Sequence, residues 1–357
     1  MKILINALSG NGDALMFSPA LRLLKNKLPD SEIDMLVMFR SVREMYAENP
    51  WLNKIHYIDL LNQSKFKSFR EIRKLKNNNY DFSVNVYPSN RFEYNLLNAL
   101  LGAKSKLAHH YIHTDIFRAE YFNDILINEV KNRHNVLQNM DLISQIVKVN
   151  ESETGRMEIF ISGEDKVRSD KWHMEINPEK KTIAGFHPGS ALLKNHINKR
   201  WDKNKFAELG CRLMDEFDVM ILLFGNEFEL NNEINALMHN RAVIASTSNY
   251  MDSVARMVNC KLFVSNDTAF MHTAAALQIP VAAIFGYTNA EELSPWMTDN
   301  VVIRKNLDCS PCFYNSPKPA DCIWKGAESF KCIKSISVDE VFEACIKLLK
   351  KNQTLPS

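Results

Sequence analysis

The feature that most constrains this fold is an alternation of short apolar, β-rich runs with longer segments of helical periodicity. The alternation occurs twice, over about residues 1–101 and again over about residues 182–285. Such alternation predicts a parallel sheet with helices on both faces. The polar stretch VNESETGRME (149–158) separates the two series and is typical of a linker. A chain of 357 residues also exceeds one ordinary core. We therefore expect two doubly wound α/β domains, residues 1–160 and 161–357.

The expected elements can be assigned by residue range. In the first series, strands are expected at 2–7, 33–38, 54–58 and 81–87, and helices at 14–28, 41–48, 67–77 and 91–101. In the second, strands are expected at 182–187, 219–224, 242–246, 261–265 and 281–285, and helices at 202–216, 228–238, 250–258 and 269–277. Residues 104–133 show no clear period and precede a helix expected at 134–148. Because ligands of such sheets bind beyond the carboxyl ends of the strands, the residues after each strand are the candidate site.

Composition limits the classes of partner. The chain is 46% hydrophobic and 24% charged, as is ordinary for a globular protein, and its net charge of +2 does not predict nucleic-acid binding. The longest apolar runs, such as VAAIF, are far shorter than the ~20 residues of a membrane-spanning helix. The first residues lack the pattern of a signal peptide, so a cytoplasmic protein is expected.

The segment SGNGD (9–13) follows the first expected strand and resembles a nucleotide-binding turn. The dinucleotide fingerprint would need a third glycine at position 15, where Leu15 stands, and no Gly-Lys-Ser/Thr follows. The turn instead delivers a carboxylate, Asp13, to the end of the strand. Two interpretations stay open: Asp13 caps the helix that begins there, or it accepts a proton from an attacking hydroxyl.

The run KLFVSNDTAFMHTAAAL (261–277) places a helix start directly after a strand. Free amides and the helix dipole make such a start an anion site, so Thr268 and the amides near Ala269 could hold a diphosphate. His272, one turn further on, could donate a hydrogen bond to it. The alternative is that Asp267 and Thr268 only cap the helix and that His272 is a core residue.

Two further strand ends carry candidate binding residues. HPGSALLKNHINKRW contains Ser190, which can approach a ligand, and Lys199, which could neutralise a phosphate or be a solvated surface charge. FGNEFE contains Glu227 and Glu229, either of which could bind ribose hydroxyls or simply begin a helix with favourable dipole sign.

Four of the seven cysteines crowd into one segment near the C-terminus, and they are Cys309, Cys312, Cys322 and Cys332. In a reducing compartment such spacing favours a metal over disulfides, and four thiolates suit tetrahedral zinc or iron. The alternative is a set of free thiols that pack a loop.

The expected helix KFKSFREIRKLK (65–76) carries six cations against one acid. Phe66, Phe69, Ile72 and Leu75 are interpreted as one apolar stripe that packs on the sheet, with a solvated basic face opposite. A second interpretation is that the basic face contacts an anionic membrane or a phosphorylated glycolipid.

Together these stretches resemble glycosyltransferase family 9, the bacterial heptosyltransferases. The resemblance covers almost the whole chain and rests on residues 12–29, 80–91, 187–201, 224–229 and 266–289 and on the cysteine segment. It implies the GT-B fold: two doubly wound Rossmann-like domains facing across a cleft. An N-terminal acceptor-binding domain would precede a C-terminal nucleotide-sugar-binding domain, which contains the cysteine segment 309–332 and a C-terminal helix. The family usually has glycine where Ala269 stands.

The resemblance also implies a reaction, the inverting transfer of a heptose from ADP-heptose to a lipopolysaccharide acceptor. It makes Asp13 the general base, and it lets Lys199, Thr268 and His272 stabilise the leaving ADP. Asp267 matches a ligand-site residue, for which capping or a ribose contact is favoured. Catalysis needs no cofactor, and relatives with a similar cysteine cluster suggest a structural iron or zinc ion.

The implied partners are a nucleotide-sugar donor, a glycolipid acceptor and the inner face of the inner membrane, where the protein would bind peripherally. Three alternatives stay open: a nucleotide-sugar epimerase of the same architecture, a family member with another sugar donor or a protein acceptor, and a non-catalytic interaction module. A nicotinamide oxidoreductase is disfavoured by the missing third glycine.

Overall fold

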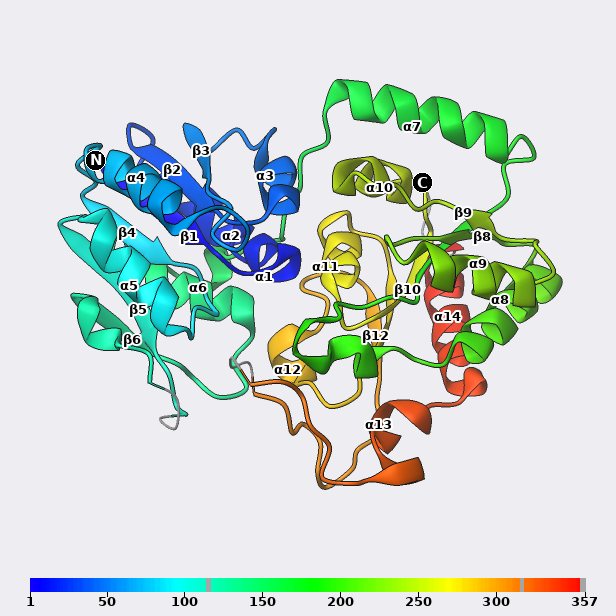
Figure 1. Ribbon diagram of the computed structural model, residues 1–357. Coiled ribbons are helices and arrows are strands. Elements are labelled where there is room, and N and C mark those ends of the chain that lie inside the picture. The colour runs from blue at the N-terminus through cyan, green and yellow to red at the C-terminus, as the bar shows by residue number, and fades with distance from the viewer. Residues whose placement is uncertain (114–116, 315–317, 354–357) are drawn as a thin grey trace. The chain divides into compact units, whose positions relative to one another are not determined.

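The two series of alternating elements form two separate parallel sheets. The computed structural model describes residues 1–113, 117–314 and 318–353. Met1–Phe160 forms one unit, and Ile161–Tyr314 with the chain from Lys318 onward forms the other. The strand orders are β3-β2-β1-β4-β5-β6 and β12-β11-β10-β7-β8-β9, so each unit repeats one doubly wound order (Figure 1). The predicted fold class of two doubly wound α/β sheets is confirmed.

The described residues of the first unit form six strands and six α-helices. Its strands are β1 (Lys2–Ala7), β2 (Glu32–Val37), β3 (Lys54–Tyr57), β4 (Phe82–Asn85), β5 (Ser105–His110) and β6 (Ile125–Asn128). Its helices are α1 (Asn11–Leu15), α2 (Ser18–Lys27), α3 (Arg40–Tyr46), α4 (Lys65–Lys76), α5 (Phe92–Leu101) and α6 (Asn135–Ile143), with 3₁₀ turns η1 (Glu120–Phe122) and η2 (Glu151–Glu153).

The central strand β1 shows why strands of this unit could be predicted from the sequence. Ile3 pairs with Ile33 of β2 on one side and with Phe82 of β4 on the other, and the strand is buried on both faces. A strand covered by helices on both faces is a continuous apolar run. By contrast β5 and β6 were not predicted from the sequence. β5 (SKLAHH) is rich in polar residues, and β6 (ILIN) is a four-residue edge strand in which every second residue is exposed.

The second unit has the same strand plan with more helices. Its strands are β7 (Ile183–His187), β8 (Met220–Leu223), β9 (Val243–Ile244), β10 (Leu262–Asn266), β11 (Val281–Ile284) and β12 (Asn300–Ile303). Its helices are α7 (Gly163–Ile176), α8 (Lys203–Phe217), α9 (Phe228–Leu237), α10 (Tyr250–Met257), α11 (Ala269–Ala276), α12 (Ala290–Leu293), α13 (Lys331–Lys334) and α14 (Val338–Gln353), with 3₁₀ turns η3 (Leu193–Lys199) and η4 (Gly326–Glu328).

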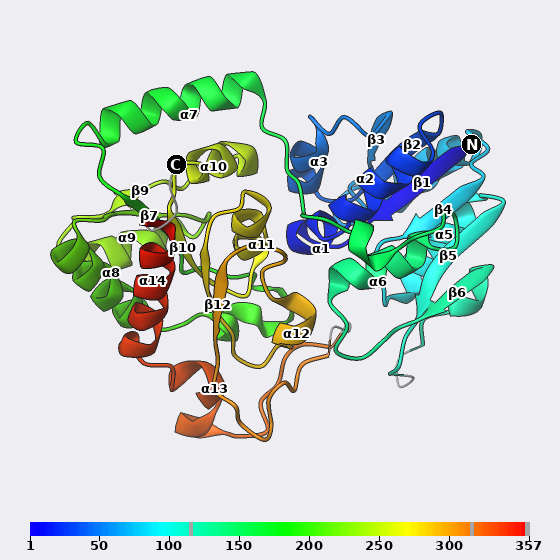
Figure 2. The same ribbon diagram turned by 180° about the vertical axis from the view of Figure 1, so that it is seen from behind.

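Helices cover both faces of this second sheet, as the view from behind also shows (Figure 2). One core lies between the sheet and α8, α9 and α14, and it includes Phe206, Ile234 and Val341. The other core lies under α10 and α11, where Met257 and Met271 are buried. No helix within the described ranges combines the length and the apolar character needed to cross a membrane.

The predicted apolar stripe of α4 is wrong for its first two members. Ile72 and Leu75 pack in the core of the first unit, whereas Phe66 and Phe69 are 79% and 53% exposed. The reason is geometric: residues three apart on an α-helix lie about 60° apart around its axis, so four of them span half the circumference. Only two of the four can therefore face the sheet.

Candidate functional site

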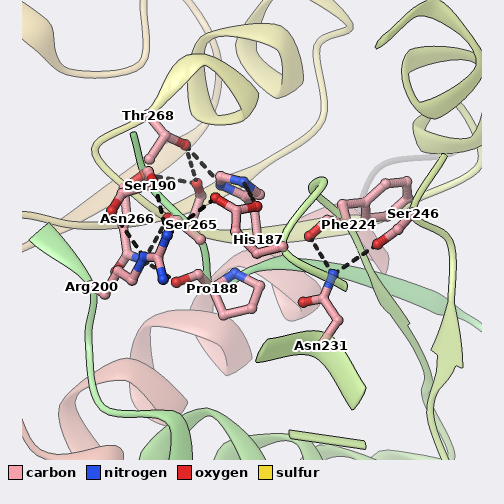
Figure 3. A network of polar contacts seen from close by, with 12 residues as sticks. His187, Pro188, Ser190, Arg200, Phe224, Asn231, Ser246, Ser265, Asn266 and Thr268 are labelled. Carbon is pink, nitrogen blue, oxygen red and sulfur yellow. Dashed lines mark hydrogen bonds and ion pairs between the residues drawn. The ribbon is translucent and has the colours of Figure 1, made fainter. Parts of the chain in front are cut away.

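The candidate site of the second unit lies where the strand order reverses, between β7 and β10. These strands pair side by side, with His187 at the end of β7 opposite Ser265 of β10. The loops that leave them diverge to opposite sides of the sheet, which is where doubly wound sheets bind ligands. Polar side chains from both loops meet there (Figure 3).

Asn266 ties these two loops together. It is fully buried, its Nδ2 donates to the carbonyls of Pro188 at 2.9 Å and Gly189 at 3.2 Å, and its Oδ1 accepts from the backbone N–H of Trp201 at 3.0 Å. The side chain therefore fixes both ends of the loop that carries the candidate binding residues. In the sequence, the only signal of this role of Asn266 is its position at the end of a strand.

Lys199 and Asp267 form a buried ion pair across the site. Lys199 Nζ lies 2.6 Å from Asp267 Oδ2 and also donates to the Asp267 carbonyl at 3.4 Å. Burial acts to raise the pKa of Asp267, but the charge and hydrogen bond of Lys199 outweigh it and hold that pKa below its usual value. The N-cap of α11 is Thr268, so the interpretation of Asp267 as a cap is wrong. Its carboxylate neutralises and orients Lys199.

The start of α11 has no side-chain cap, because the Thr268 hydroxyl contacts other side chains instead of the backbone of the helix. Its Oγ1 lies 2.9 Å from His187 Nδ1 and 3.2 Å from Ser265 Oγ, and it makes no capping hydrogen bond. The interpretation of Thr268 as a side-chain cap is therefore also wrong. Helix starts carry amides without intrahelical partners, and here Ala269, half-buried, is the first residue. This leaves the helix start suited to an anion.

A second charged cluster surrounds Glu227, one of the two acids considered for the ribose hydroxyls, and its pairing with His187 and Arg200 was not predicted. Glu227 lies 3.8 Å from His187 Nε2 and 3.5 Å from the Arg200 guanidinium. Burial acts to raise the pKa of Glu227, but hydrogen bonding and charge from His187, with the charge of Arg200, lower it overall. The carboxylate fits only because two neighbours are glycines: a Cβ on Gly189 would overlap it, and one on Gly225 would come within 2.6 Å.

Ser190 is buried and serves the loop itself. Its hydroxyl donates to the His196 carbonyl at 2.8 Å and accepts from Arg200 Nε at 3.1 Å, while Arg200 also donates to the Ser190 carbonyl at 2.9 Å. Ser190 therefore stabilises the turn that carries Lys199.

The loop is also held by the cysteine segment. Lys194 and Asn195 both have left-handed backbone conformations, with φ of 56° and 61°. The backbone N–H of Ala320 donates to the Lys194 carbonyl at 2.9 Å, and Asn195 Nδ2 donates to the Ala320 carbonyl at 2.9 Å. The Tyr287 hydroxyl lies 3.0 Å from His196 Nδ1. Lys199 follows three positions after His196, so these contacts position the start of the turn that presents the cation.

The two remaining predicted residues of this unit differ in placement. Glu229 is exposed in the first turn of α9, where its charge suits the helix dipole, and it is not part of the cluster around Glu227. His272 is buried in α11 and lies near enough to Asp267 to help lower the pKa of that carboxyl.

Asp13 belongs to the first unit and lies beyond the carboxyl end of β1. It is the third residue of α1, whose N-cap is Gly10 and which has no side-chain cap, so the capping interpretation is not what the structure shows. The helix is fixed by the Tyr46 hydroxyl, which donates to the Ala14 carbonyl at 2.6 Å. Burial raises the pKa of Tyr94, and the charge of Asp13 adds to that effect. Asp13 is half-buried at the switch point between β1 and β4.

The four clustered cysteines line one cavity, together with Tyr287 and Phe330. All are free thiols, and burial with the neighbouring thiols raises the pKa of Cys332 to about 11. Thiolates would suit zinc or iron, but among the residues that the structure describes no three His, Cys, Asp or Glu are placed to hold an ion. The predicted metal site at Cys309, Cys312, Cys322 and Cys332 is therefore not supported. Cys322 and Cys332 pack in the apolar core, as expected for free thiols.

Known proteins are similar to this chain in both sequence and architecture. Lipooligosaccharide heptosyltransferase 2 of Campylobacter jejuni is 24% identical over 358 residues, which cover 99% of each chain. A solved glycosyltransferase of family 9 from Veillonella parvula has a TM-score of 0.77 at 19% identity and covers 98% of this chain and 97% of its own.

The solved E. coli ADP-heptose lps heptosyltransferase II has a TM-score of 0.75 at 21% identity, and the match covers 99% of this chain and 100% of that one. These neighbours confirm the GT-B fold. The family model for glycosyltransferase family 9 (heptosyltransferase) matches residues 68–321. The chain belongs to glycosyltransferase family 9.

Proposed function

We propose that this glycosyltransferase moves a heptose from ADP-heptose to a glycolipid acceptor of the lipopolysaccharide core, with inversion at the anomeric carbon. The names of its relatives support the sugar and the acceptor class, since they include a lipooligosaccharide heptosyltransferase and an ADP-heptose lps heptosyltransferase. Such an enzyme would work at the cytoplasmic face of the inner membrane. The 1–160 unit would bind the acceptor and the 161–357 unit the nucleotide sugar.

The observation that carries the proposal is the uncapped start of α11 beside Lys199. The amides at Ala269 and the hydroxyl of Thr268 would bind the diphosphate, and Lys199, oriented by Asp267, would add a cation. Because Asp267 already neutralises Lys199, the amides and the helix dipole supply most of the attraction for the anion. His272 would support the same group from one turn inside the helix.

Ser190 and Glu229 would complete the donor site. Ser190 would hold the turn at the phosphates. The ribose hydroxyls would bind Glu229, which is exposed at the start of α9, rather than Glu227, which His187 and Arg200 already engage.

In the proposed reaction Asp13 takes the proton of the acceptor hydroxyl as that oxygen bonds to the anomeric carbon. The bond from this carbon to the diphosphate breaks on the opposite face, and ADP leaves with the electron pair. The amides of α11 and Lys199 stabilise the charge that develops on it. One displacement inverts the anomeric centre and needs neither an enzyme nucleophile nor a catalytic cofactor.

Mass spectrometry of the products from ADP-heptose and a panel of truncated glycolipids tests the proposal. Wild type should add one heptose, and Asp13→Asn should abolish turnover while ADP still binds in calorimetry. Turnover of Asp13→Asn near the wild-type rate would refute the role of the base. Conversion of donor without acceptor would indicate an epimerase, transfer to a protein or from another sugar would indicate a different substrate pair, and absence of ADP binding would indicate an interaction module.

A further inference from the structure

Helix α4 exposes two phenylalanines that no part of its own unit covers. Phe66 is 79% exposed and Phe69 53%, and Leu61, in the loop before the helix, is 60% exposed. The helix itself is firmly seated. Ile72 and Leu75 are buried in the core, and Ser64 caps the first turn by accepting from the Lys67 N–H. The exposed rings are therefore a fixed feature of the folded surface.

The cations around these rings have no acidic partners. The six basic residues of α4 are Lys65, Lys67, Arg70, Arg73, Lys74 and Lys76, and all are exposed. Across the described ranges none of them forms an ion pair, although more than twenty ion pairs occur elsewhere in the chain. The helix's one acid, Glu71, is engaged by Gln63 Nε2 at 2.9 Å. The surface thus keeps an uncompensated positive charge.

The rings and cations share one side of the helix. At 100° per residue, Phe66, Arg70 and Arg73 fall within about 60° of one another, opposite the buried Ser68, Ile72 and Leu75. Aromatic side chains at the centre of a basic helical face are typical of helices that lie in a membrane interface. The rings can enter the acyl boundary while the long basic side chains reach anionic headgroups. An acidic protein or a nucleic acid would satisfy the cations but would not require the apolar centre.

We propose that α4, with Leu61, is the surface by which this protein docks on an anionic lipid bilayer. The inference rests on the proposed function, because a glycolipid acceptor would be presented on such a surface. It adds which side chains make the contact. Phe66, Phe69 and Leu61 insert, and the cations of α4 bind the headgroups.

Co-sedimentation of the full chain with vesicles tests the proposal. Wild type should bind vesicles of phosphatidylcholine with phosphatidylglycerol, bind pure phosphatidylcholine much less, and be released by 1 M NaCl. Phe66→Ala with Phe69→Ala should weaken binding about tenfold per ring, and Arg70→Gln with Arg73→Gln about fivefold per cation. The substituted positions are exposed, so the melting temperature should stay within a few degrees of wild type.

Helix α7 offers a matched control. Val167 and Met174 are each 69% exposed there, but the helix has three Lys or Arg against four Asp or Glu. Val167→Ala with Met174→Ala should leave vesicle binding unchanged. Equal binding to neutral vesicles, unaltered binding by either α4 double variant, or a Phe66/Phe69-dependent dimer in place of vesicle binding would overturn the proposal.

A soluble, short-chain acceptor separates this inference from the proposed function. The α4 variants should transfer heptose to it at the wild-type rate, because they lose only the bilayer. If wild type fails with that acceptor yet binds anionic vesicles through α4, the proposed function fails and the docking surface stands.

Discussion

Removal of one hydroxyl, in Tyr287→Phe, should weaken nucleotide binding although Tyr287 lies outside the proposed nucleotide contacts. Burial lowers the pKa of His196 to about 4, so its ring is neutral at pH 7, and burial also raises the pKa of Tyr287. The Tyr287 hydroxyl and His196 Nδ1, which lie 3.0 Å apart, share one hydrogen bond. The His196 carbonyl in turn accepts from Ser190, and Lys199 follows three residues later.

The magnitude follows from a single buried hydrogen bond. Its loss costs about 1 kcal/mol, and an unpaired Nδ1 adds a similar amount. If these costs, about 1–2 kcal/mol together, oppose the loop conformation in which Lys199 binds the diphosphate, ADP affinity falls about five- to thirtyfold. Isothermal titration calorimetry with ADP measures the effect, and thermal unfolding should show a decrease of only a few degrees for a unit of this size.

Tyr80→Phe is the matched control. It removes a hydroxyl that donates to Asp34 at 2.6 Å in the other unit, so it should lower stability and leave ADP affinity unchanged. His196→Phe should lower affinity as Tyr287→Phe does, and the double variant should show little further loss, because both remove the same bond. Unchanged ADP affinity in Tyr287→Phe, with a stability loss like that of the control, would refute the positioning role.

Three further predictions concern single side chains. Asp267→Asn breaks a buried ion pair and should destabilise the protein by about 3 kcal/mol. The pKa of Asp267 is lowered below 3.8 in the folded protein, so the stability that this carboxylate contributes is present above pH 3.8 and is lost as the pH falls through the folded-state pKa. Denaturation curves of wild type and variant should therefore converge only in acid. Gly189→Ala should cost about 1 kcal/mol of stability and weaken ADP binding, because its Cβ would displace the Glu227 carboxylate from His187 and Arg200. A variant as stable as wild type would contradict this. Cys312 is exposed, whereas Cys332 is buried with a pKa of about 11, so Cys312→Ser should remove a fast phase of thiol titration with a disulfide reagent, while Cys332→Ser should leave it intact.

The strands that could be predicted are those buried on both faces. The run 3–5 within β1 and the run 281–285 at β11 are continuously apolar, and neither β1 nor β11 is an edge strand. The strand β5 is too polar to give such a signal, and the edge strand β6 (ILIN) is only four residues long and partly exposed. The helical spacing of the apolar residues of α4 could be recognised in the sequence. Which of them are buried depends on how the helix packs against the sheet, which the sequence does not show.

The loops of the candidate site were also predictable, because strand ends mark them in any doubly wound sheet. What could not be predicted was pairing. Lys199 and Asp267 are 68 residues apart, and nothing local shows that they neutralise each other. Likewise Asn266 and Glu227 take their roles from backbone carbonyls and charges contributed by other loops. The cysteine spacing suggested a metal, whereas the fold places two of those thiols among apolar side chains.

The repeated strand order has a consequence for how such enzymes can diversify. Each half has its own reversal in the order of its strands, at β1 and β4 in one and at β7 and β10 in the other. Among the described residues, Met1–Phe160 forms one half, and Ile161–Tyr314 with the chain from Lys318 onward forms the other. Substitutions around one reversal therefore need not disturb the buried bonds that shape the other. Under the proposed roles of the two units, a lineage could exchange the alcohol it modifies while the residues that bind the activated sugar are inherited unchanged.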